Sequence, residues 1–572
     1  MNRYQAISNA PAFQPSVQQP EELTPALALT QAYDTWSKRL PWQQNSACAD
    51  QFVLIDAMGN GVQFLSLLQL WHETQADSRS QNSASPQPQL NVYALDLNPW
   101  SLESLRCFWL NGSDGSDALD WMLRHWPAAT PGLHCIQFQP WRCTLWLWFG
   151  DQERGLMQLT GHLDAAQLKL KLTPKPQRHL DCLLQAKPLH TPRAVAFSIA
   201  VVGAGIAGTC TAKALCDQGF EVHLLDAADG PAAGASGNWV GAFHPHITRD
   251  DTPLSQLTRL GCEFSLQALE SLTRQGLLVK GMDWDTPGHL QTIPPDEVQR
   301  TQGTLAQLQF PDNVVQWAEP FSKMETPLHG LFFPQGAWAK PARWVQANIK
   351  ACGPRLKVHY GCKVKDLSTL HVQLGQHVDA VVVACAQESF AVAMLNPGNS
   401  NSVKGQITRM QKSEQAANNI PHVASGESYA IAPPAETWVL LGATYERPVG
   451  ELMPTEASDA LNIARFQAAF PTLRLGQHVD SRCAVRFVWP DRLPVVGPVV
   501  SSVVGAELGV MQGKPTVYLN TAYASRGLTW AALAAHQVAS SIRKQAGLCN
   551  DTWEMQLTRR LNPRTKLPAS AP

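Results

Sequence analysis

Two stretches of the chain share one pattern, in which a short apolar run is followed by a glycine turn and then by a mostly apolar segment. They are FVLIDAMGNGVQFLSLLQLW, residues 52–71, and SIAVVGAGIAGTCTAKAL, residues 198–215. Short apolar runs that end at glycines are typical of buried strands, and the longer segments after them are typical of helices. Each stretch therefore predicts the strand, turn and helix that begin a nucleotide-binding sheet.

The pattern around the first stretch continues as alternating strands and helices. Residues 90–97 (LNVYALDL) and 143–151 (CTLWLWFGD) predict two more strands, a Ser/Gln/Pro-rich loop over 76–89 separates the first pair, and residues 25–40 predict a helix. A segment rich in Pro, Lys, Arg and His precedes the second stretch. We therefore predict a first α/β domain over 1–168, a basic Pro-rich linker over 169–195 and a second domain over 196–572.

The second stretch carries a complete dinucleotide fingerprint. Gly203, Gly205 and Gly208 have G-x-G-x-x-G spacing, and the next predicted strand, EVHLLD, ends at Asp226. The first glycine permits a tight turn, the second lets a pyrophosphate approach the helix N-terminus, and the third allows close packing of helix on strand. The carboxylate of Asp226 is placed to accept the adenosine ribose hydroxyls.

Later segments favour FAD over NAD as the dinucleotide. A second small-residue loop, GPAAGASGNWVGAFHPHI, follows the fingerprint, and it contains the candidate cofactor contacts Ser236, Gly237 and Asn238. A simple NAD dehydrogenase does not need such a loop. Residues 378–386 (VDAVVVACA) predict a strand that returns to the nucleotide sheet after an inserted substrate domain, and residues 523–539 predict a loop and a helix whose N-terminus could face the flavin.

Composition narrows the classes of partner and the cellular location. Charged residues make up 16% of the chain and the net charge is −1, so contact with nucleic acid must come from a local patch. Thirteen cysteines without a C-x-x-C pair indicate reduced thiols in a cytoplasmic protein and no cysteine-based metal site. The sequence has no signal peptide and no long apolar run, which predicts no membrane span. The oligomeric state stays open.

Seven motifs in the second half of the chain carry a family resemblance. They are, in chain order, GASGNWVGAFHPHI, GLFFPQGAWAKPARWV, VKGQITRM, SGESYAIAP, LLGATYER, VRFVWPDRLPVVG and ASRGLTWA. Together they resemble the FAD domain of the MnmC family of bifunctional tRNA 5-methylaminomethyl-2-thiouridine biosynthesis proteins, and more broadly the glycine oxidase and D-amino-acid oxidase group. The resemblance implies an FAD-binding Rossmann domain with an inserted α+β substrate domain.

The same resemblance implies a reaction and a partner. The FAD half would oxidatively remove the carboxymethyl group from 5-carboxymethylaminomethyl-2-thiouridine at the tRNA wobble position, leaving the aminomethyl base. Arg486 and Arg526 would hold the substrate carboxylate, and Tyr429 would donate a hydrogen bond. Arg482 competes with Arg486 for the clamp, while structural ion pairs for the arginines and ordinary packing for Tyr429 remain alternatives.

Three positions depart from the family pattern within the oxidase half. His244 stands where the family usually has Tyr, and Cys385 with Ala386 stands where Asn and Gly are usual. His244 is either a catalytic base or a neutral packed side chain. Cys385 is interpreted as a small buried residue rather than a reactive thiol.

The first stretch resembles the family's S-adenosylmethionine loop only in part. Gly59, Gly61, the ribose-binding Asp96 and the Asp151 of FGD match, but Ala57 replaces the first glycine of the loop. After Asp151 the chain has no counterpart of the segment that faces the target amine in the family. We therefore expect a shortened, methyltransferase-type Rossmann-like domain that keeps the frame of the cofactor site without the methyl transfer step.

Two other functions stay open at this point. The chain could be an FAD-dependent oxidase of small amines or amino acids, or a tRNA-binding protein without catalysis. The basic linker could contact phosphates or serve only as a solvated connector.

Overall fold

The computed structural model describes two compact units, which meet in the sequence at residue 196. The described residues are 24–39, 51–55, 58–78, 89–110, 116–151, 155, 198–323, 326–367, 370–413, 423–448, 451–499 and 516–543. The first unit comprises residues 1–196 with 543–554, and the second comprises 197–542 with 555–572. The linker expected over 169–195 lies outside the described residues.

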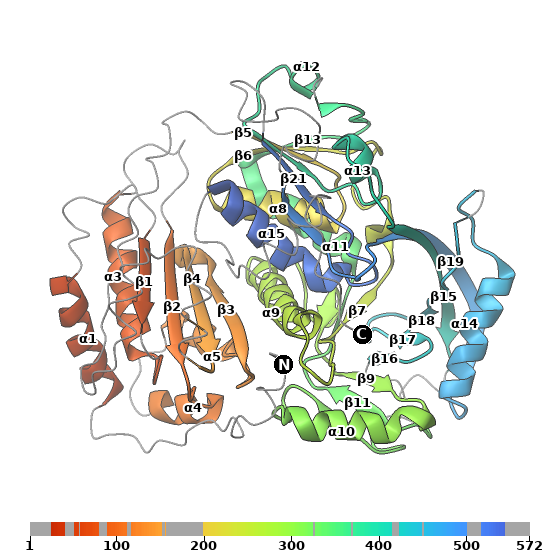
Figure 1. Cartoon of the computed structure of the whole chain (residues 1–572), viewed down its shortest axis with the longest axis horizontal. Coiled ribbons are helices and arrows are strands. Elements are labelled where there is room, and N and C mark those ends of the chain that lie inside the picture. Colours follow the sequence, from red (N-terminus) through yellow and green to blue (C-terminus); the bar gives the residue numbers. More distant parts are fainter. Residues whose placement is uncertain are drawn as a thin grey trace, which may run out of the picture. The chain divides into compact units, whose positions relative to one another are not determined.

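The first unit is built on a four-stranded sheet in the order β1-β2-β4-β3 (Figure 1). Strands β1, β2 and β4 run parallel, and β3 pairs antiparallel with β4. All seven residues of β2, LNVYALD, are buried, as a parallel strand covered on both faces requires. The elements are α1 (Pro25–Arg39), β1 (Gln51–Ile55), α3 (Val62–Ser78), β2 (Leu90–Asp96), α4 (Leu102–Leu110), α5 (Asp117–Arg124), β3 (Gly132–Phe138) and β4 (Cys143–Phe149).

Two features of this unit differ from the sequence-based expectation. Strand β3, which forms a hairpin with β4, was not expected, and α3 continues to Ser78, into the predicted loop. Strand β1 pairs only with β2, so in the described part of the unit it is the edge of the sheet. In a doubly wound sheet the strand carrying the glycine turn has a neighbour on each side.

Tryptophan side chains fill much of the core of the first unit. Trp36, Trp71 and Trp109 are at most 3% exposed. Their indole N–H groups still find acceptors: Trp36 donates to the carbonyl of Gln63 at 3.0 Å and Trp71 to that of Trp141 at 2.9 Å. These rings therefore help to pack α1 against α3 without leaving their own N–H groups unpaired.

The second unit contains a six-stranded sheet in the order β13-β6-β5-β14-β21-β20. Five strands run parallel, and β20 is antiparallel to β21. The strand order reverses between β5 and β14, because β5 leads to β6 on one side while β14 lies on the other. This is the doubly wound arrangement predicted from the fingerprint. The strands are β5 (Ser198–Val202), β6 (Glu221–Leu225), β13 (Leu356–His359), β14 (Ala380–Val383), β20 (Val495–Pro498) and β21 (Thr516–Thr521).

The inserted substrate domain carries an eight-stranded sheet in the order β10-β11-β9-β16-β17-β18-β15-β19, beside a three-stranded sheet β7-β12-β8. The large sheet is antiparallel except for the β9–β16 pair. Its strands are β9 (His289–Thr292), β10 (Gln316–Ala318), β11 (Gly330–Phe333), β15 (Asn401–Lys412), β16 (Val423–Ser425), β17 (Tyr429–Ile431), β18 (Trp438–Gly442) and β19 (Leu475–Val488); those of the small sheet are β7 (Gly241–Phe243), β8 (Trp284–Asp285) and β12 (Ala337–Ala339).

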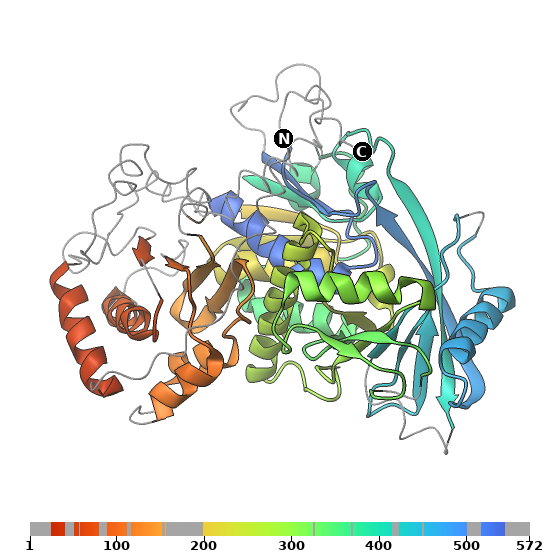
Figure 2. The same cartoon turned by 60° about the horizontal axis from the view of Figure 1, so that its bottom comes forward.

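The two faces of the long strands β15 and β19 serve different purposes. Side chains alternate between the two faces of a strand, so Arg482 and Arg486, which are four residues apart on β19, lie on one face. Ile407 of β15 pairs with Arg482 and lies on that face as well. The opposite face carries Gln406 and Thr408 and packs against α14 (Glu456–Ala469), which lies along the outside of β15 and β19 in Figure 2. The arginine-bearing face is therefore free of α14.

Helices of the second unit pack tightly where they approach the fingerprint. A Cβ on Gly261 would lie 2.5 Å from the carbonyl oxygen of Thr529, and the Ser265 hydroxyl donates to the carbonyl of Leu528 at 2.6 Å. Helices α9 (Pro253–Arg274) and α15 (Gly527–Arg543) are thereby held together at the start of α15. The other helices of this unit are α8 (Ile206–Asp217), α10 (Val298–Leu308), α11 (Pro341–Cys352), α12 (Leu370–Leu374) and α13 (Glu388–Val392). In the part of the chain that the structure describes, no helix has the length and apolarity to cross a membrane.

Candidate active site

The fingerprint turn lies where the strand order of the six-stranded sheet reverses. Gly203 follows β5 with φ +111°, and a Cβ there would lie 2.6 Å from the carbonyl oxygen of Ala384, which follows β14. A Cβ on Gly208 would lie 1.8 Å from the carbonyl oxygen of Gly203. Both glycines are therefore required by sterics, the first also by its backbone conformation.

Gly205 has a different role, because its outer side is open. A Cβ there would meet only the hydroxyl of Ser236, at 3.1 Å. That hydroxyl accepts a hydrogen bond from the backbone N–H of Ile206, the first residue of α8, at 2.9 Å. The start of the helix is thus an anion site bordered by one small hydroxyl, and it fits a dinucleotide pyrophosphate.

Asp226 lies at the end of β6 and keeps capacity for a ligand. Its Oδ2 accepts from the backbone N–H of Ala204 at 2.6 Å, and its Oδ1 accepts from that of Ala228 at 2.9 Å. The side chain is only partly buried. Since an ionised carboxylate offers about four acceptor positions, it can also take ribose hydroxyls, and the residues present fit an adenine dinucleotide.

Arg482 holds the small-residue loop next to the fingerprint. Its guanidinium donates to the side-chain oxygen of Asn238 at 3.0 Å and to the carbonyls of Ala233 and Gly234 at 3.2 and 2.8 Å. A Cβ on Gly237 would lie 2.7 Å from Nη2 of this arginine. Arg482 is therefore engaged in shaping the loop that carries Ser236, Gly237 and Asn238.

The N-terminus of α15 reaches the start of α8. A Cβ on Gly527 would lie 3.8 Å from Cγ2 of Ile206. Arg526 directly precedes α15, and burial lowers its pKa, with a further lowering from Arg492. The backbone N–H of Ala524 donates to the carbonyl of Phe487 at 3.1 Å, which ties the segment leading to Arg526 to the strand of Arg486.

Arg486 lies across a glycine and against an aromatic ring. A Cβ on Gly405 would lie 2.3 Å from Nη2 of Arg486, and the guanidinium carbon lies 4.7 Å from the ring centroid of Tyr445. Its Nη1 is buried without a hydrogen-bond partner. Tyr429 lies on the same face of the sheet, and burial raises its pKa to about 12 despite a lowering influence of Arg486. The three candidate catalytic residues therefore belong to adjoining segments.

The histidines beside the arginines are neutral. Burial, with Arg526 and Arg492 nearby, lowers the pKa of His246 to about 4. Burial also lowers the pKa of His244 to about 4, and its ring lies 4.0 Å from that of His289 and 4.6 Å from that of Phe333. The structure thus supports a packed neutral role for His244.

Cys385 follows β14 beside the fingerprint. Burial raises the pKa of its thiol to about 11, so the thiolate is scarce at neutral pH. The raised pKa agrees with the interpretation as an unreactive thiol, although Cys385 is only partly buried. Among the described residues, no group of three or more His, Cys, Asp or Glu side chains could hold a metal ion.

The glycine turn of the first unit is covered on one side only. Gly59 and Gly61 have φ +51° and +82°. A Cβ on Gly61 would lie 2.9 Å from Cε of Met122, and the indole of Trp109 donates to the carbonyl of Asn60 at 3.0 Å. A Cβ on Gly59, by contrast, would meet nothing within 4 Å. Side chains therefore close the turn at Gly61 and leave it open at Gly59.

Asp96, the ribose candidate of the first unit, is 6% exposed. Its Oδ1 accepts from the backbone N–H of Asn98 at 3.1 Å, and its Oδ2 lies 3.4 Å from that of Gly59. Asp151 is exposed beyond the end of β4. With β1 at the sheet edge in the described ranges, the side of the turn where such cofactors bind lacks a neighbouring strand. The described residues therefore keep part of the frame of a nucleotide site, with Gly61 and Asp96 closed in by the protein.

Three residues of the site were not singled out from the sequence. Tyr445, Arg492 and His246 all lie within the quoted motifs, in LLGATYER, DRLPVVG and GAFHPHI. Their proximity depends on which strands are neighbours. Tyr445 follows β18, and it meets Arg486 of β19 because both strands pair with β15. The motifs therefore located these residues in the sequence, but they did not reveal the role of each one.

Comparison with known proteins gives long but distant matches. The chain is 28% identical to the tRNA 5-methylaminomethyl-2-thiouridine biosynthesis bifunctional protein MnmC of Cupriavidus necator, over 86% of this chain and 87% of that protein. It is 26% identical to the protein of the same name from Thiobacillus denitrificans, over 87% and 88%. The chain is thus MnmC-like over most of its length.

Solved structures share the fold of the second unit. Glycine oxidase from Bacillus cereus matches with a TM-score of 0.51 and 15% identity, over 62% of this chain and 97% of that one. Iminodiacetate oxidase from Chelativorans sp. BNC1 matches with a TM-score of 0.50 and 18% identity, over 61% and 96%. Residues 198–541 match the family described as FAD dependent oxidoreductase. This match covers more than half of the chain and the complete fingerprint. The chain therefore belongs to the FAD-dependent oxidoreductase family, and its cofactor is FAD.

Proposed function

We propose that this chain removes the carboxymethyl group from 5-carboxymethylaminomethyl-2-thiouridine at the wobble position of tRNA, leaving 5-aminomethyl-2-thiouridine. The reaction breaks a C–H bond of the carboxymethyl carbon, and water then hydrolyses the resulting imine to the primary amine and glyoxylate. Bound FAD supplies a hydride acceptor for a carbon beside an amine. The names of the relatives support tRNA as the carrier of this amine.

The observation that carries the proposal is the buried, unpartnered Nη1 of Arg486. A buried cationic donor without an acceptor costs free energy unless a ligand supplies one. A carboxylate is the natural acceptor for an arginine fork. Arg486 would therefore hold the carboxylate of the substrate, with the phenol of Tyr429 as a neutral hydrogen-bond donor beside it.

The charges around Arg486 also favour the reactive form of the amine. Arg526 and Arg492 both lower the pKa of His246, and Arg492 also lowers the pKa of Arg526. Both arginines therefore add positive charge to the same site. Positive charge disfavours protonation of a substrate amine. The neutral amine, which has the free electron pair needed for oxidation, is thereby stabilised without a dedicated base.

We further propose the domain assignment expected from the sequence, with a methyltransferase-like unit over 1–168, a linker over 169–195 and the oxidoreductase over 196–572. The covered Gly61 and the buried Asp96 support a first unit that no longer transfers a methyl group. The product would then remain the aminomethyl base.

The test is nucleoside mass spectrometry of tRNA that carries the carboxymethyl modification. Incubation with the flavin-loaded protein should convert the carboxymethyl nucleoside into the aminomethyl one, and added S-adenosylmethionine should yield no methylaminomethyl product. A carboxymethyl nucleoside that persists would contradict the oxidation. Rapid turnover of N-methylglycine in place of tRNA would instead identify a small-molecule amine oxidase.

A further inference from the structure

Tyr445 is an exposed aromatic residue next to the half-buried Arg486 of the site. The residue is 66% exposed, whereas most aromatic residues of the second unit are buried. One face of the ring is covered by the guanidinium of Arg486, whose Cζ lies 4.7 Å from the ring centroid. The exposed area therefore belongs to the rest of the ring, including its other face.

The backbone that carries Tyr445 is fixed on both sides. Lys404 and Glu446 exchange two backbone hydrogen bonds of 2.9 Å. The backbone N–H of Thr444 donates to the carbonyl of Gln406 at 3.2 Å, and the N–H of Gln406 donates to the hydroxyl of Thr444 at 3.0 Å. Tyr445 thus projects from a rigid edge of β15, and little conformational entropy remains to be lost when a ligand packs on it.

The charges near the ring are predominantly positive. Arg486 contacts it, and Tyr445 in turn influences the pKa of Arg526. The carboxylate next to the ring, Glu446, is already engaged by the hydroxyl of Ser458 at 2.6 Å and the ammonium of Lys404 at 3.6 Å. A planar group with an attached anion is the chemistry that fits such a surface.

We propose that Tyr445 stacks on the pyrimidine ring of the target nucleotide and so orients its carboxymethylamino group toward Arg486. The inference rests on the proposed function and adds the residue that distinguishes a nucleotide from a free amino acid. A small amine needs only the carboxylate clamp, whereas a base has a planar face that an exposed ring can bind. Stacking on an aromatic side chain tolerates any base, so the C5 substituent would be selected by Arg486.

Binding of RNA to ring variants of the flavin-loaded protein tests the stacking. The probe is a fluorescein-labelled anticodon stem-loop with unmodified uridine at the wobble position, measured by fluorescence anisotropy. Tyr445→Leu should weaken binding roughly tenfold or more, while Tyr445→Phe, which keeps the ring, should stay within about twofold of the wild type. Phe321→Leu removes another exposed ring, of 61% exposure, and should have no effect.

The outcomes separate the stacking from the reaction. Wild-type affinity in Tyr445→Leu, equal losses in the Leu and Phe variants, or no binding of the stem-loop by the wild type would each overturn the stacking. If Tyr445-dependent binding is found but the carboxymethyl nucleoside persists in tRNA, the proposed reaction fails and the stacking stands. If the nucleoside is converted but Tyr445→Leu binds normally, the reaction stands and the stacking fails.

Discussion

Arg486 lies directly over Gly405 on the neighbouring strand, so that a Cβ on the glycine would lie 2.3 Å from Nη2 and 2.6 Å from Cζ of the arginine. Glycine in a strand interior weakens the strand unless something must approach its backbone closely. Here the approaching group is the guanidinium, and Tyr445 covers it from another side. The position of the candidate carboxylate clamp is therefore set by a residue that makes no contact through a side chain of its own.

Gly405→Ala should displace the clamp while leaving the cofactor site intact. The added methyl group forces the guanidinium to move by about 1 Å, which typically costs roughly 100-fold in kcat/KM. Flavin content, measured by absorbance, should stay at the wild-type level. Gly303→Ala is the matched control, because a Cβ at Gly303 meets nothing within 4 Å. Unchanged kcat/KM in Gly405→Ala would show that Arg486 does not hold the substrate.

Substitution of Arg482 should weaken flavin binding, whereas substitution of Arg486 should weaken the use of substrate. Arg482→Ala removes three hydrogen bonds to the loop over 233–238, so flavin should dissociate roughly 10- to 100-fold more readily. Arg486→Ala should keep the flavin and lose roughly 100-fold or more in kcat/KM. Flavin titration and steady-state kinetics on both variants check this. The assignment is wrong if the two variants have the same pattern of loss.

The same pair shows how far sequence reasoning reached. The motifs placed Arg482 and Arg486 in the oxidase half, but both arginines remained candidates for one role. The choice depends on the loop over 233–238, which is separated from β19 by more than 200 residues and meets it only in the folded chain. Short-range patterns cannot report such a contact.

The two glycine motifs illustrate a second limit. Strand, turn, helix and acid were recognised in both, and both adopt the expected local structure. Asp226 remains partly exposed, whereas Asp96 is 6% exposed beside a turn that Met122 covers at Gly61. The difference comes from strand order and from side chains such as Met122, which belong to distant segments. The altered loop at Ala57, which lies outside the described residues, hinted at the loss without giving its cause.

Gly205→Val should abolish flavin binding. The branched side chain would fill the open side of the turn and displace the hydroxyl of Ser236, which blocks the approach of the pyrophosphate to the N-terminus of α8. The purified variant should lack flavin absorbance and retain a cooperative unfolding transition. Gly303→Val, on the exposed part of α10, should keep its flavin. A flavin-replete Gly205→Val protein would refute the assigned fingerprint.

The stability of the protein should fall between pH 6.5 and pH 4. Burial lowers the pKa of His244, His246 and His536 to about 4, whereas an unfolded histidine has a pKa of about 6.5. In this window the unfolded chain binds protons that the folded chain does not, so stability rises with pH, by roughly 1–3 kcal/mol per histidine. Urea unfolding at several pH values measures the slope. His536→Gln should make the slope shallower, and an unaltered slope would contradict the buried neutral state.

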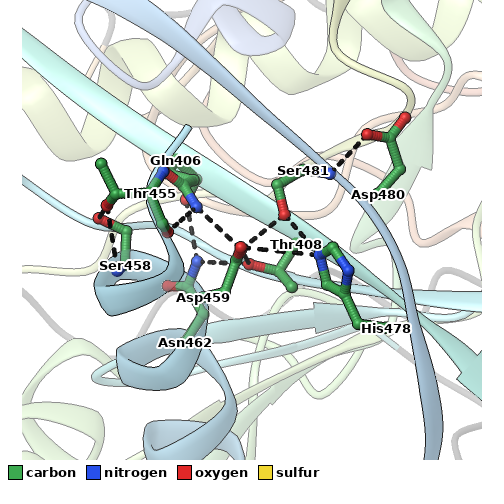
Figure 3. Close-up of polar contacts among 9 residues, drawn as sticks. All are labelled: Gln406, Thr408, Thr455, Ser458, Asp459, Asn462, His478, Asp480 and Ser481. Atoms are coloured by element: carbon green, nitrogen blue, oxygen red, sulfur yellow. Dashed lines mark hydrogen bonds and ion pairs between the residues drawn. The ribbon is translucent and has the colours of Figure 1, made fainter. Parts of the chain in front are cut away.

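Asp459 should be a major determinant of how α14 holds the back of β15 and β19. Figure 3 shows its carboxylate at the centre of a polar network, where Oδ1 accepts from Nε2 of Gln406 at 2.8 Å and from the hydroxyls of Thr408 and Ser481 at 2.6 Å each. Gln406 and Thr408 are fully buried. Removal of the carboxylate would leave these donors without their acceptor.

Asp459→Ala should therefore lower the free energy of unfolding by roughly 3 kcal/mol, because unpaired buried donors cost about 1–3 kcal/mol each and can only partly find new partners. Asp459→Asn should cost less, since the Thr408 and Ser481 hydroxyls can reorient toward an amide. Glu456→Ala, an exposed change on the same helix, should cost about 0.5 kcal/mol at most. Denaturant titration of the three variants ranks them. Because the network lies on the face of β15 opposite Gly405, Asp459→Asn should retain KM, and a large rise in KM would show that the back of the sheet controls the arginine on its front.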